Sequence, residues 1–173
     1  MSYLSLVTDV SALTRLLVGL LTYLNNKIAA IETRVSQMNQ SKSDIEQLGS
    51  DRTHIYVLKR PEGMCGSVTK EKDKEVNINA PTDGLAVHEI KHISQSLNVG
   101  KLNFYKGALQ NAGTSNKERG MNEENAYKAQ FSLNGFIPGA KGVHSPNEIV
   151  IPLIKGMRDS NGKLLYPYLS EKK

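Results

Sequence analysis

Two histidines one helical turn apart, with a glutamate between them, are the residues in this sequence best suited to chemistry. The stretch His88-Glu89-Ile90-Lys91-His92 reads H-E-x-x-H. Residues four apart lie on the same face of a helix, so His88 and His92 can direct two imidazoles at one metal ion. Glu89 lies beside them, within reach of a metal-activated water but badly placed as a third ligand. This spacing predicts hydrolysis of a carbonyl compound with a zinc ion and Glu89 as the base.

The residues around this motif favour a helix. Residues 76–79 are typical of a short strand, residues 80–84 of a turn, and Thr82 or Asp83 of a helix N-cap. An apolar stripe follows at helical spacing, formed by Ala86, Ile90, Ile93 and Leu97. His88 and His92 lie off this stripe, on a neighbouring face. The alternative interpretation is a surface helix that carries two solvated histidines.

A catalytic zinc site needs a third protein ligand from elsewhere in the chain. The candidates are Glu123, Glu124, His144 and His54. A second helix is predicted over residues 122–133, and we favour Glu123 because the small Ala126, one turn later on the same face, would let this helix approach the first. In the alternative interpretation, both glutamates only complement the positive end of their own helix.

The sequence gives less support for a functional role of the two further histidines, His144 and His54. His144 precedes Ser145-Pro146 in a looping stretch, and it is a candidate donor of a hydrogen bond to a developing oxyanion, which would make Glu89 and His144 the catalytic residues. The alternative is a loop histidine without a catalytic role. His54 alternates with Ile55 on a predicted strand, where an exposed histidine is the commoner case.

The elements that must position these residues predict an α+β fold. Strands are expected over residues 53–60, 67–70 and 76–79, and a loop over 107–120 that would lie near the cleft. The small sheet would pack on the motif helix and on the second, ligand-bearing helix. Residues 1–49 are expected to form an amphipathic helix and linker, and residues 50–173 the metal-binding domain.

The N-terminal block carries a coiled-coil-like seam. Apolar residues recur at intervals of three and four, with one additional four-residue interval between Leu24 and Ile28. The seam consists of Leu13, Leu17, Leu20, Leu24, Ile28, Ile31, Val35 and Met38. It predicts either contact with other chains, in an oligomer or a docked partner through residues 4–38, or packing on the chain's own domain. Residues 40–51 are polar and are the best candidate for a linker or helix stop.

A membrane span is not expected. Residues 13–24 are apolar almost all round, but Arg15 interrupts them and the uncharged run is shorter than the roughly 20 residues that a bilayer needs. Residues 1–7 have no charged side chain, so a signal peptide is not expected either, and the compartment stays open. Binding to a membrane surface through residues 13–24 is a weaker alternative.

Composition excludes other classes. The 173 residues carry a net charge of +5, and no run of Lys and Arg is interleaved with aromatics, so nucleic-acid binding is not expected. Cys65 is the single cysteine, which excludes an intramolecular disulfide.

Residues 50–135 resemble the gluzincin class of zinc metallopeptidases. The resemblance rests on His88-Glu89-x-x-His92 followed by Asn122-Glu123-x-x-Ala126-Tyr127, and it is greatest to the small metallopeptidase domains of bacterial Rhs-type polymorphic toxins and effectors. It implies one Zn²⁺ on His88, His92 and Glu123, with Glu89 as the base and a peptide or protein as substrate. Tyr127 stands where the related thermolysin-like pattern has an acidic residue, so the histidines must be oriented by other groups.

The leading hypothesis is therefore a zinc metallopeptidase with an N-terminal oligomerising or docking helix. The second is a structural or assembly component, for example of a phage particle or secretion apparatus, that keeps a peptidase-like fold. The N-terminal helix serves both hypotheses, because it could anchor a peptidase to an assembly.

Overall fold

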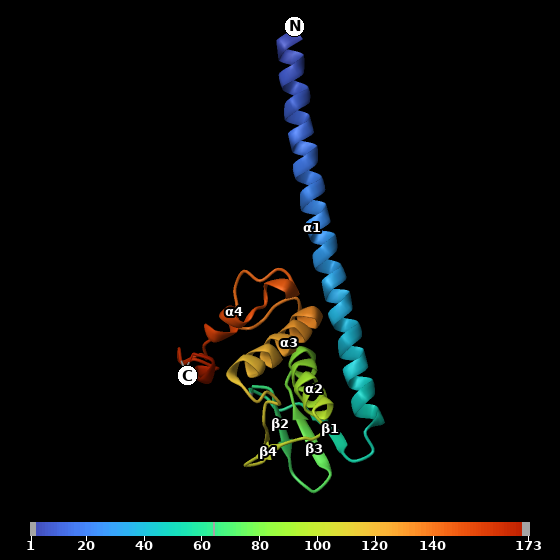
Figure 1. Ribbon diagram of the computed structural model, residues 1–173, viewed down its shortest axis with the longest axis vertical. Helices are drawn as coiled ribbons and strands as arrows, with labels where there is room; N and C mark the ends of the chain where they lie inside the picture. Colours follow the sequence, from blue (N-terminus) through green and yellow to red (C-terminus); the bar gives the residue numbers. More distant parts are fainter. Residues whose placement is uncertain (1–2, 64, 171–173) are drawn as a thin grey trace.

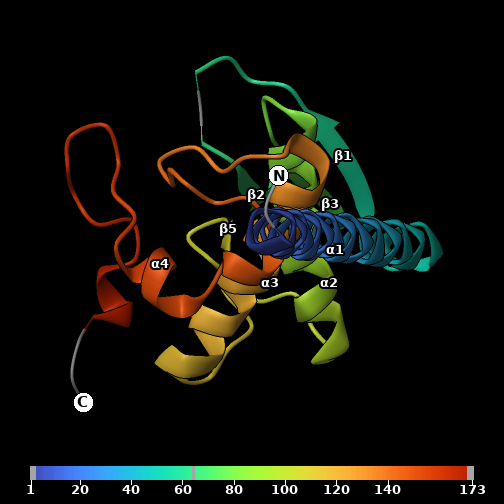
Figure 2. The ribbon, with the colours of Figure 1, turned by 90° about the horizontal axis from the view of Figure 1, so that it is seen from above.

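The protein has an α+β fold, as the sequence predicts (Figure 1). The computed structural model describes residues 3–63 and 65–170, with side chains from Val10 onward. Helix α1 (Tyr3–Ser50) projects far beyond a small domain made of a mixed sheet and further helices. Seen along α1, the other helices and the sheet lie around its lower end (Figure 2).

Helix α1 is longer than predicted. Residues 40–51 were expected to form a linker or a helix stop; they continue the helix and end it at Ser50, so the linker is wrong and the helix stop at the end of this segment is confirmed. Ser41, Asp44 and Leu48 recur at intervals of three and four, and all three are buried. Packing of this face on the domain stabilises a polar segment as a helix, although its composition alone favours a linker.

The sheet has five strands in the order β1-β3-β2-β5-β4. Its strands are β1 (Ile55–Lys59), β2 (Ser67–Lys70), β3 (Glu75–Asn79), β4 (Phe104–Tyr105) and β5 (Ala108–Leu109). Strands β1 and β3 are parallel, and the other pairs are antiparallel. The three predicted strands are confirmed, whereas β5 lies within residues 107–120, which were expected to form a loop.

Helix α2 (Asp83–Asn98) carries the H-E-x-x-H motif and packs on the sheet. The side-chain oxygen of Thr82 caps it by accepting a hydrogen bond from the N–H of Leu85. Its buried apolar residues Ala86 and Ile93 join Val76 and Ile78 of β3 in one core. The predicted stripe therefore holds the motif in place against the sheet.

Helix α3 (Asn116–Asn134) starts six residues earlier than predicted. Ser115 and Glu118 form a capping box at its start, and Gly135 ends it in the left-handed conformation (φ 77°). Glu123 therefore lies in the second turn rather than the first, where an acidic residue contributes little to the helix dipole.

The C-terminal segment packs on α3 as a second core. It contains η1 (Pro146–Glu148), α4 (Ile151–Lys155) and η2 (Pro167–Leu169). Ile149, Ile154 and Leu169 are buried against Tyr127 and Phe131 of α3. This core fixes the side of α3 that faces away from the sheet.

A buried ion pair ties α1 to the motif helix. The Lys91 ammonium lies 2.9 Å from Asp44 Oδ2, and the Ser94 hydroxyl donates to Asp44 Oδ1 at 2.8 Å. Arg34 of α1 also donates to the backbone oxygen of Ser132 in α3, at 3.0 Å. The lower half of α1 is thus a structural part of the domain.

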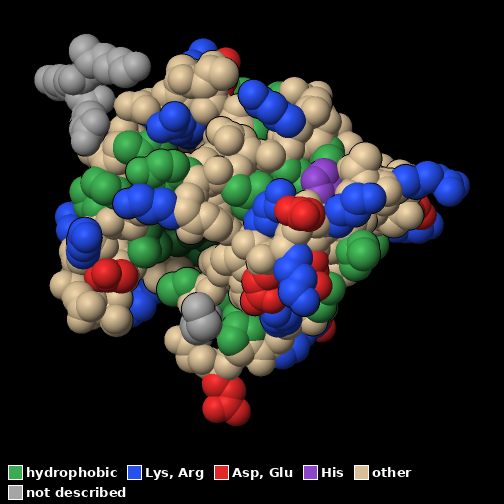
Figure 3. All heavy atoms as spheres, turned by 90° about the horizontal axis from the view of Figure 1, so that it is seen from below, with side chains coloured by type: hydrophobic (Ala, Val, Ile, Leu, Met, Phe, Trp, Pro, Cys, Tyr) green, Lys and Arg blue, Asp and Glu red, His purple; other side chains and the backbone are tan. Residues whose placement is uncertain are grey.

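The charged surface of the domain is mixed. Seen from below, Lys and Arg side chains are spread over the lower face with Asp and Glu among them (Figure 3). No helix among the described residues has both the length and the hydropathy to cross a bilayer.

Candidate metal centre

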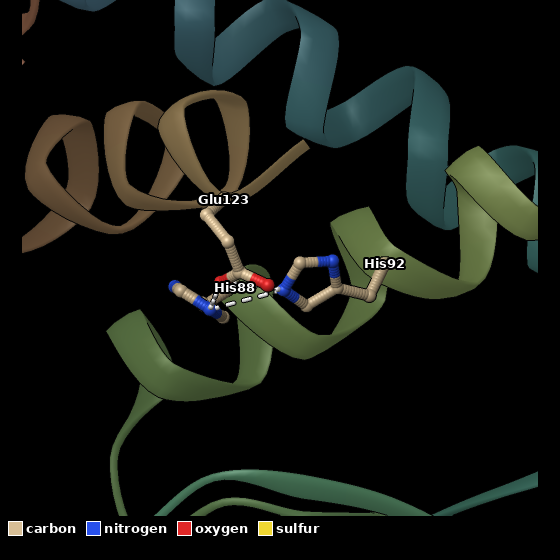
Figure 4. A group of neighbouring side chains, drawn as sticks. All are labelled: His88, His92 and Glu123. Carbon is tan, nitrogen blue, oxygen red and sulfur yellow. Dashed lines mark hydrogen bonds and ion pairs between the residues drawn. The ribbon is translucent and has the colours of Figure 1, made fainter. Parts of the chain in front are cut away.

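Three side chains from two helices converge on one point (Figure 4). His88 Nε2 and His92 Nε2 lie 3.2 Å apart. Glu123 Oε2 lies 3.8 Å from His88 Nε2 and 3.4 Å from His92 Nε2. The structure thus brings together the three ligands predicted from the sequence, and this group could hold a metal ion.

The geometry follows from the crossing of α2 and α3. His88 and His92 are one turn apart on α2, and Glu123 reaches them from α3. Ala126 is fully buried, and its small side chain allows the close approach of the two helices that was predicted. The centre is therefore built by packed helices rather than by mobile loops.

Polar neighbours orient His92 and Glu123. His92 Nδ1 lies 3.0 Å from Gln95 Oε1, and the amide of Gln95 donates to the backbone oxygen of Asn122. A proton on Nδ1 leaves the lone pair of Nε2 free for a cation. Asn111 donates to Glu123 Oε1 at 3.0 Å and accepts from Asn122 at 2.8 Å. Glu123 Oε2 is left to face the histidines.

The surroundings of His88 differ from those of His92. His88 Nδ1 and Gln130 Oε1 are buried, and neither has a hydrogen-bond partner within the described chain. The amide oxygen of Gln130 nevertheless favours the protonated form of His88. The ring of Tyr127 packs edge-on against the His88 ring, with centroids 4.6 Å apart. Gln95 thus orients His92, and the ring of Tyr127 packs against His88.

In the metal-free site, burial and neighbouring charges give His88, His92 and Glu123 very different pKa values. Burial and the charge of His92 lower the pKa of His88 to about 3, so His88 is neutral. Burial opposes a charge on His92 as well, but Glu123 outweighs this effect and raises the pKa of His92 to about 9. Burial raises the pKa of Glu123, but the two histidines lower it to about 2. A proton on His92 therefore occupies the place that a cation would take.

Glu89 lies in a buried position that raises its pKa to about 7. Loss of solvation is the main cause; the His92 charge opposes it and Glu123 adds to it. The side chain passes directly against the backbone of Gly66, where a Cβ atom would overlap Glu89 Oε1. This contact explains the glycine, because any larger residue would displace the carboxyl group.

Glu89, His92 and Glu123 border a cavity of about 220 Å³. Its opposite wall is made of residues that precede or belong to β2 and β5, including Gly66, Val68 and Leu109, and Asn111 closes one side. Part of the stretch predicted as a loop near the cleft, residues 107–120, thus borders this cavity.

The other candidate residues lie elsewhere. Glu124 accepts from Lys128 at 2.6 Å and from the N–H of Ile151 at 3.1 Å, so it ties α3 to α4. His54 lies 2.8 Å from Asp51 Oδ2 in a turn after α1. Neither belongs to the converging group.

His144 does not lie at the centre. It borders a separate depression on α1 with Tyr23 and Asn26, and its backbone N–H donates to Glu148. Its predicted role as an oxyanion donor does not fit this position, because the loop after α3 folds back toward α1.

Comparison with known proteins gave no match: no family model, no curated protein and no solved structure matches the chain. The case for a function therefore rests on the geometry above.

Proposed function

We propose that the protein is a zinc-dependent metallopeptidase. The observation that carries this proposal is the convergence of His88, His92 and Glu123 within 3.2–3.8 Å of one another, inside the domain. The resemblance of the two helix motifs to gluzincins supports the same reaction.

The spacing of the three atoms fits zinc. Ligand atoms about 2.0–2.1 Å from a tetrahedral zinc ion are about 3.3 Å from one another, and the three distances here scatter around that value. Two imidazoles and one carboxylate, with a position left open, form the donor set of a catalytic zinc site. A zinc ion bound there would polarise a substrate carbonyl and lower the pKa of a water.

Glu89 supplies the proton transfer in this proposal. Its carboxyl lies in the cavity beside His92 and Glu123, where it can accept a proton and later donate it. Glu89 would take a proton from the attacking water and pass it to the leaving amine. Because Gly66 has no side chain, it leaves room for the Glu89 carboxyl and does not fill the cavity.

Tyr166 is a candidate for donating a hydrogen bond to the substrate oxygen. This is the role that was predicted for His144, whose position does not fit it. Its phenol lies 2.8 Å from the phenol of Tyr127, whose ring contacts His88. Burial and the charge of Glu123 raise the pKa of Tyr166 far above its ordinary value. The phenol therefore keeps its proton and can donate a hydrogen bond at any physiological pH. Sequence analysis missed this residue, since a tyrosine in a C-terminal tail has no distinguishing pattern.

Metal content and peptide cleavage test the proposal together. Purified protein should contain one zinc per chain by elemental mass spectrometry and should cleave an unfolded protein such as casein. Glu89→Gln should keep the zinc and lose cleavage, whereas Glu123→Gln should lose both. Lys128→Gln, which only affects the pairing of Glu124, is the control. Zinc-loaded Glu89→Gln protein that still cleaves would contradict the role of Glu89.

A structural or assembly component is the second candidate. The apolar stripe of α1 favours it, because this stripe is exposed and belongs to no packed core of the described chain. Protein that binds no zinc and cleaves nothing, but forms stable oligomers, would support this candidate over the peptidase.

A further inference from the structure

Helix α1 exposes a long apolar stripe. The seam predicted over residues 13–38 extends from Val10 to Ile45, and its apolar members are 46–60% exposed. At 1.5 Å per residue the stripe is about 50 Å long. Monomeric proteins rarely leave continuous apolar surfaces of this extent in water, so the stripe requires a partner.

The chain's own domain does not cover the stripe. The domain packs on a different face of α1, through Ser41, Asp44 and Leu48. At 100° per residue, this face is centred roughly 110° around the helix axis from the stripe. Figure 1 shows the upper part of α1 standing clear of the domain. Of the two alternatives for the seam, packing on the chain's own domain is therefore wrong, and the stripe is free for another chain.

The lower end of the stripe is continuous with an apolar groove. Met38 and Ile45 form one wall of a groove of about 610 Å³, and Leu58, Ile90 and Leu133 of the domain belong to its other walls. A helix lying along the stripe would therefore enter this groove and contact both α1 and the domain.

Charge placement favours a second copy of α1, parallel and in register. With Ile28 at position a of a heptad, Lys27 occupies position g of the preceding heptad. Glu32 then occupies position e of the heptad that begins at Ile28. In parallel, aligned helices, a residue at position g of one helix faces the residue at position e five positions later in the other helix. Lys27 of one copy therefore meets Glu32 of the neighbouring copy. Antiparallel helices pair g with g and e with e, which would lose this ion pair.

The width of the stripe favours the same arrangement. Around Leu17 and Leu24 it broadens, because the flanking residues Leu16, Leu21 and Tyr23 are also apolar and 57–69% exposed. From Ile28 onward it narrows to a single seam flanked by charged residues. Parallel, aligned copies place the broad part against the broad part along the whole stripe, whereas antiparallel copies do so only if the rest of the stripe stays uncovered. Apolar residues at the flanking positions also provide contacts for more than two helices.

We infer that α1 assembles with α1 of other copies into a parallel, in-register bundle of three or more chains. The domains flank the bundle at its C-terminal end, because each packs on a face of α1 roughly 110° from the seam. This inference does not depend on the proposed peptidase activity.

Mass in solution tests the assembly. Light scattering after size exclusion should give at least three times the chain mass of 19.1 kDa for the full chain. The variant Leu17→Lys with Leu24→Lys should fall to the mass of one chain. Thr22→Lys adds a charge on the opposite face of α1 and should leave the oligomer intact. A full chain that runs as a monomer would overturn the inference.

Charge exchange tests the register. Lys27→Glu and Glu32→Lys should each weaken the oligomer, and the two changes together should restore it. If the double variant is no better than the single ones, the parallel, in-register pairing is wrong.

Crosslinking tests the direction. In a Cys65→Ser background, Leu13→Cys should form a disulfide between copies under mild oxidation, because parallel alignment places each residue 13 beside its counterpart. Absence of this crosslink in an intact oligomer would contradict parallel, in-register packing and overturn the proposal. Flotation of a monomeric chain with anionic phospholipid vesicles would overturn it in favour of a membrane surface.

Discussion

Replacement of Glu89 by glutamine should stabilise the metal-free protein, although it removes the proposed base. In the folded chain burial raises the pKa of Glu89 from its ordinary 4.5 to about 7. The unfolded chain ionises near 4.5, so between pH 4.5 and 7 it releases a proton that the folded chain retains. Stability therefore falls as the pH rises through this window, and the full cost is present above pH 7.

The size of the effect follows from the shift. At about 1.4 kcal/mol for each pH unit, the charged carboxyl destabilises the folded state by about 3 kcal/mol at pH 8. At pH 5 the cost is below about 1 kcal/mol, because Glu89 stays protonated in the folded chain and this pH lies only slightly above the pKa of Glu89 in the unfolded chain. Glu89→Gln has nearly the same shape without the charge, so it should recover most of this free energy at pH 8 and little at pH 5.

Urea denaturation of the chelator-treated protein, followed by far-ultraviolet circular dichroism, measures this difference. Protein concentration must be equal in all samples, since an oligomer gains stability with concentration. The exposed Glu62 gives a matched control, and Glu62→Gln should leave the free energy of unfolding unchanged at both values of pH. A Glu89→Gln protein that is equally or less stable than the parent at pH 8 would refute the buried, solvent-poor position assigned to this carboxyl.

Three further predictions concern the centre and its support. Zinc must displace the proton of His92, whose pKa Glu123 raises to about 9. Zinc affinity should therefore fall about tenfold for each pH unit below 9, and close to one proton should be released on binding at pH 7. Titration calorimetry in buffers of different ionisation enthalpy measures this release, and a value near zero would contradict the assignment. Gly66→Ala should lower kcat at least tenfold and keep the zinc content, because the new Cβ displaces Glu89. The control Gly49→Ala, whose Cβ meets no atom within 4 Å, should leave the activity unchanged, and equal activities in the two variants would exclude the contact between Gly66 and Glu89. Asp44→Ala should cost about 3–5 kcal/mol in urea denaturation, because it leaves the Lys91 ammonium buried without its partner, whereas Glu46→Ala, in an exposed pair with Lys42, should cost less than about 1 kcal/mol.

The sequence was sufficient for the parts of the site that depend on local spacing. Four-residue spacing placed His88 and His92 together, and the position of Ala126 one turn after Glu123 indicated which carboxylate would face them. These predictions succeed because a helix converts sequence separation directly into a shared face. The three longer strands were predicted for the related reason that β-rich runs between turn residues have few alternatives.

The parts that depend on tertiary packing were not predictable in this way. Gln95 and Asn111 are ordinary polar residues in the sequence, and their role arises only when α2, α3 and the segment before α3 meet. The continuation of α1 through residues 40–51 was missed because its polar face is stabilised by Lys91 and Ser94, which lie about fifty positions away. Local propensity does not contain such contacts.

Lys91 links the two halves of the protein. It is the fourth residue of His88-Glu89-Ile90-Lys91-His92, yet its ammonium points away from the centre and pairs with Asp44 of α1. The same turn of α2 therefore presents imidazoles to Glu123 on one side and a cation to α1 on the other. A bundle that holds α1 rigidly would hold this turn rigidly as well, so assembly and the geometry of the centre should not be independent. Zinc affinity that is lower in the monomeric Leu17→Lys with Leu24→Lys variant would demonstrate this coupling, and equal affinity would show that the domain alone sets the centre.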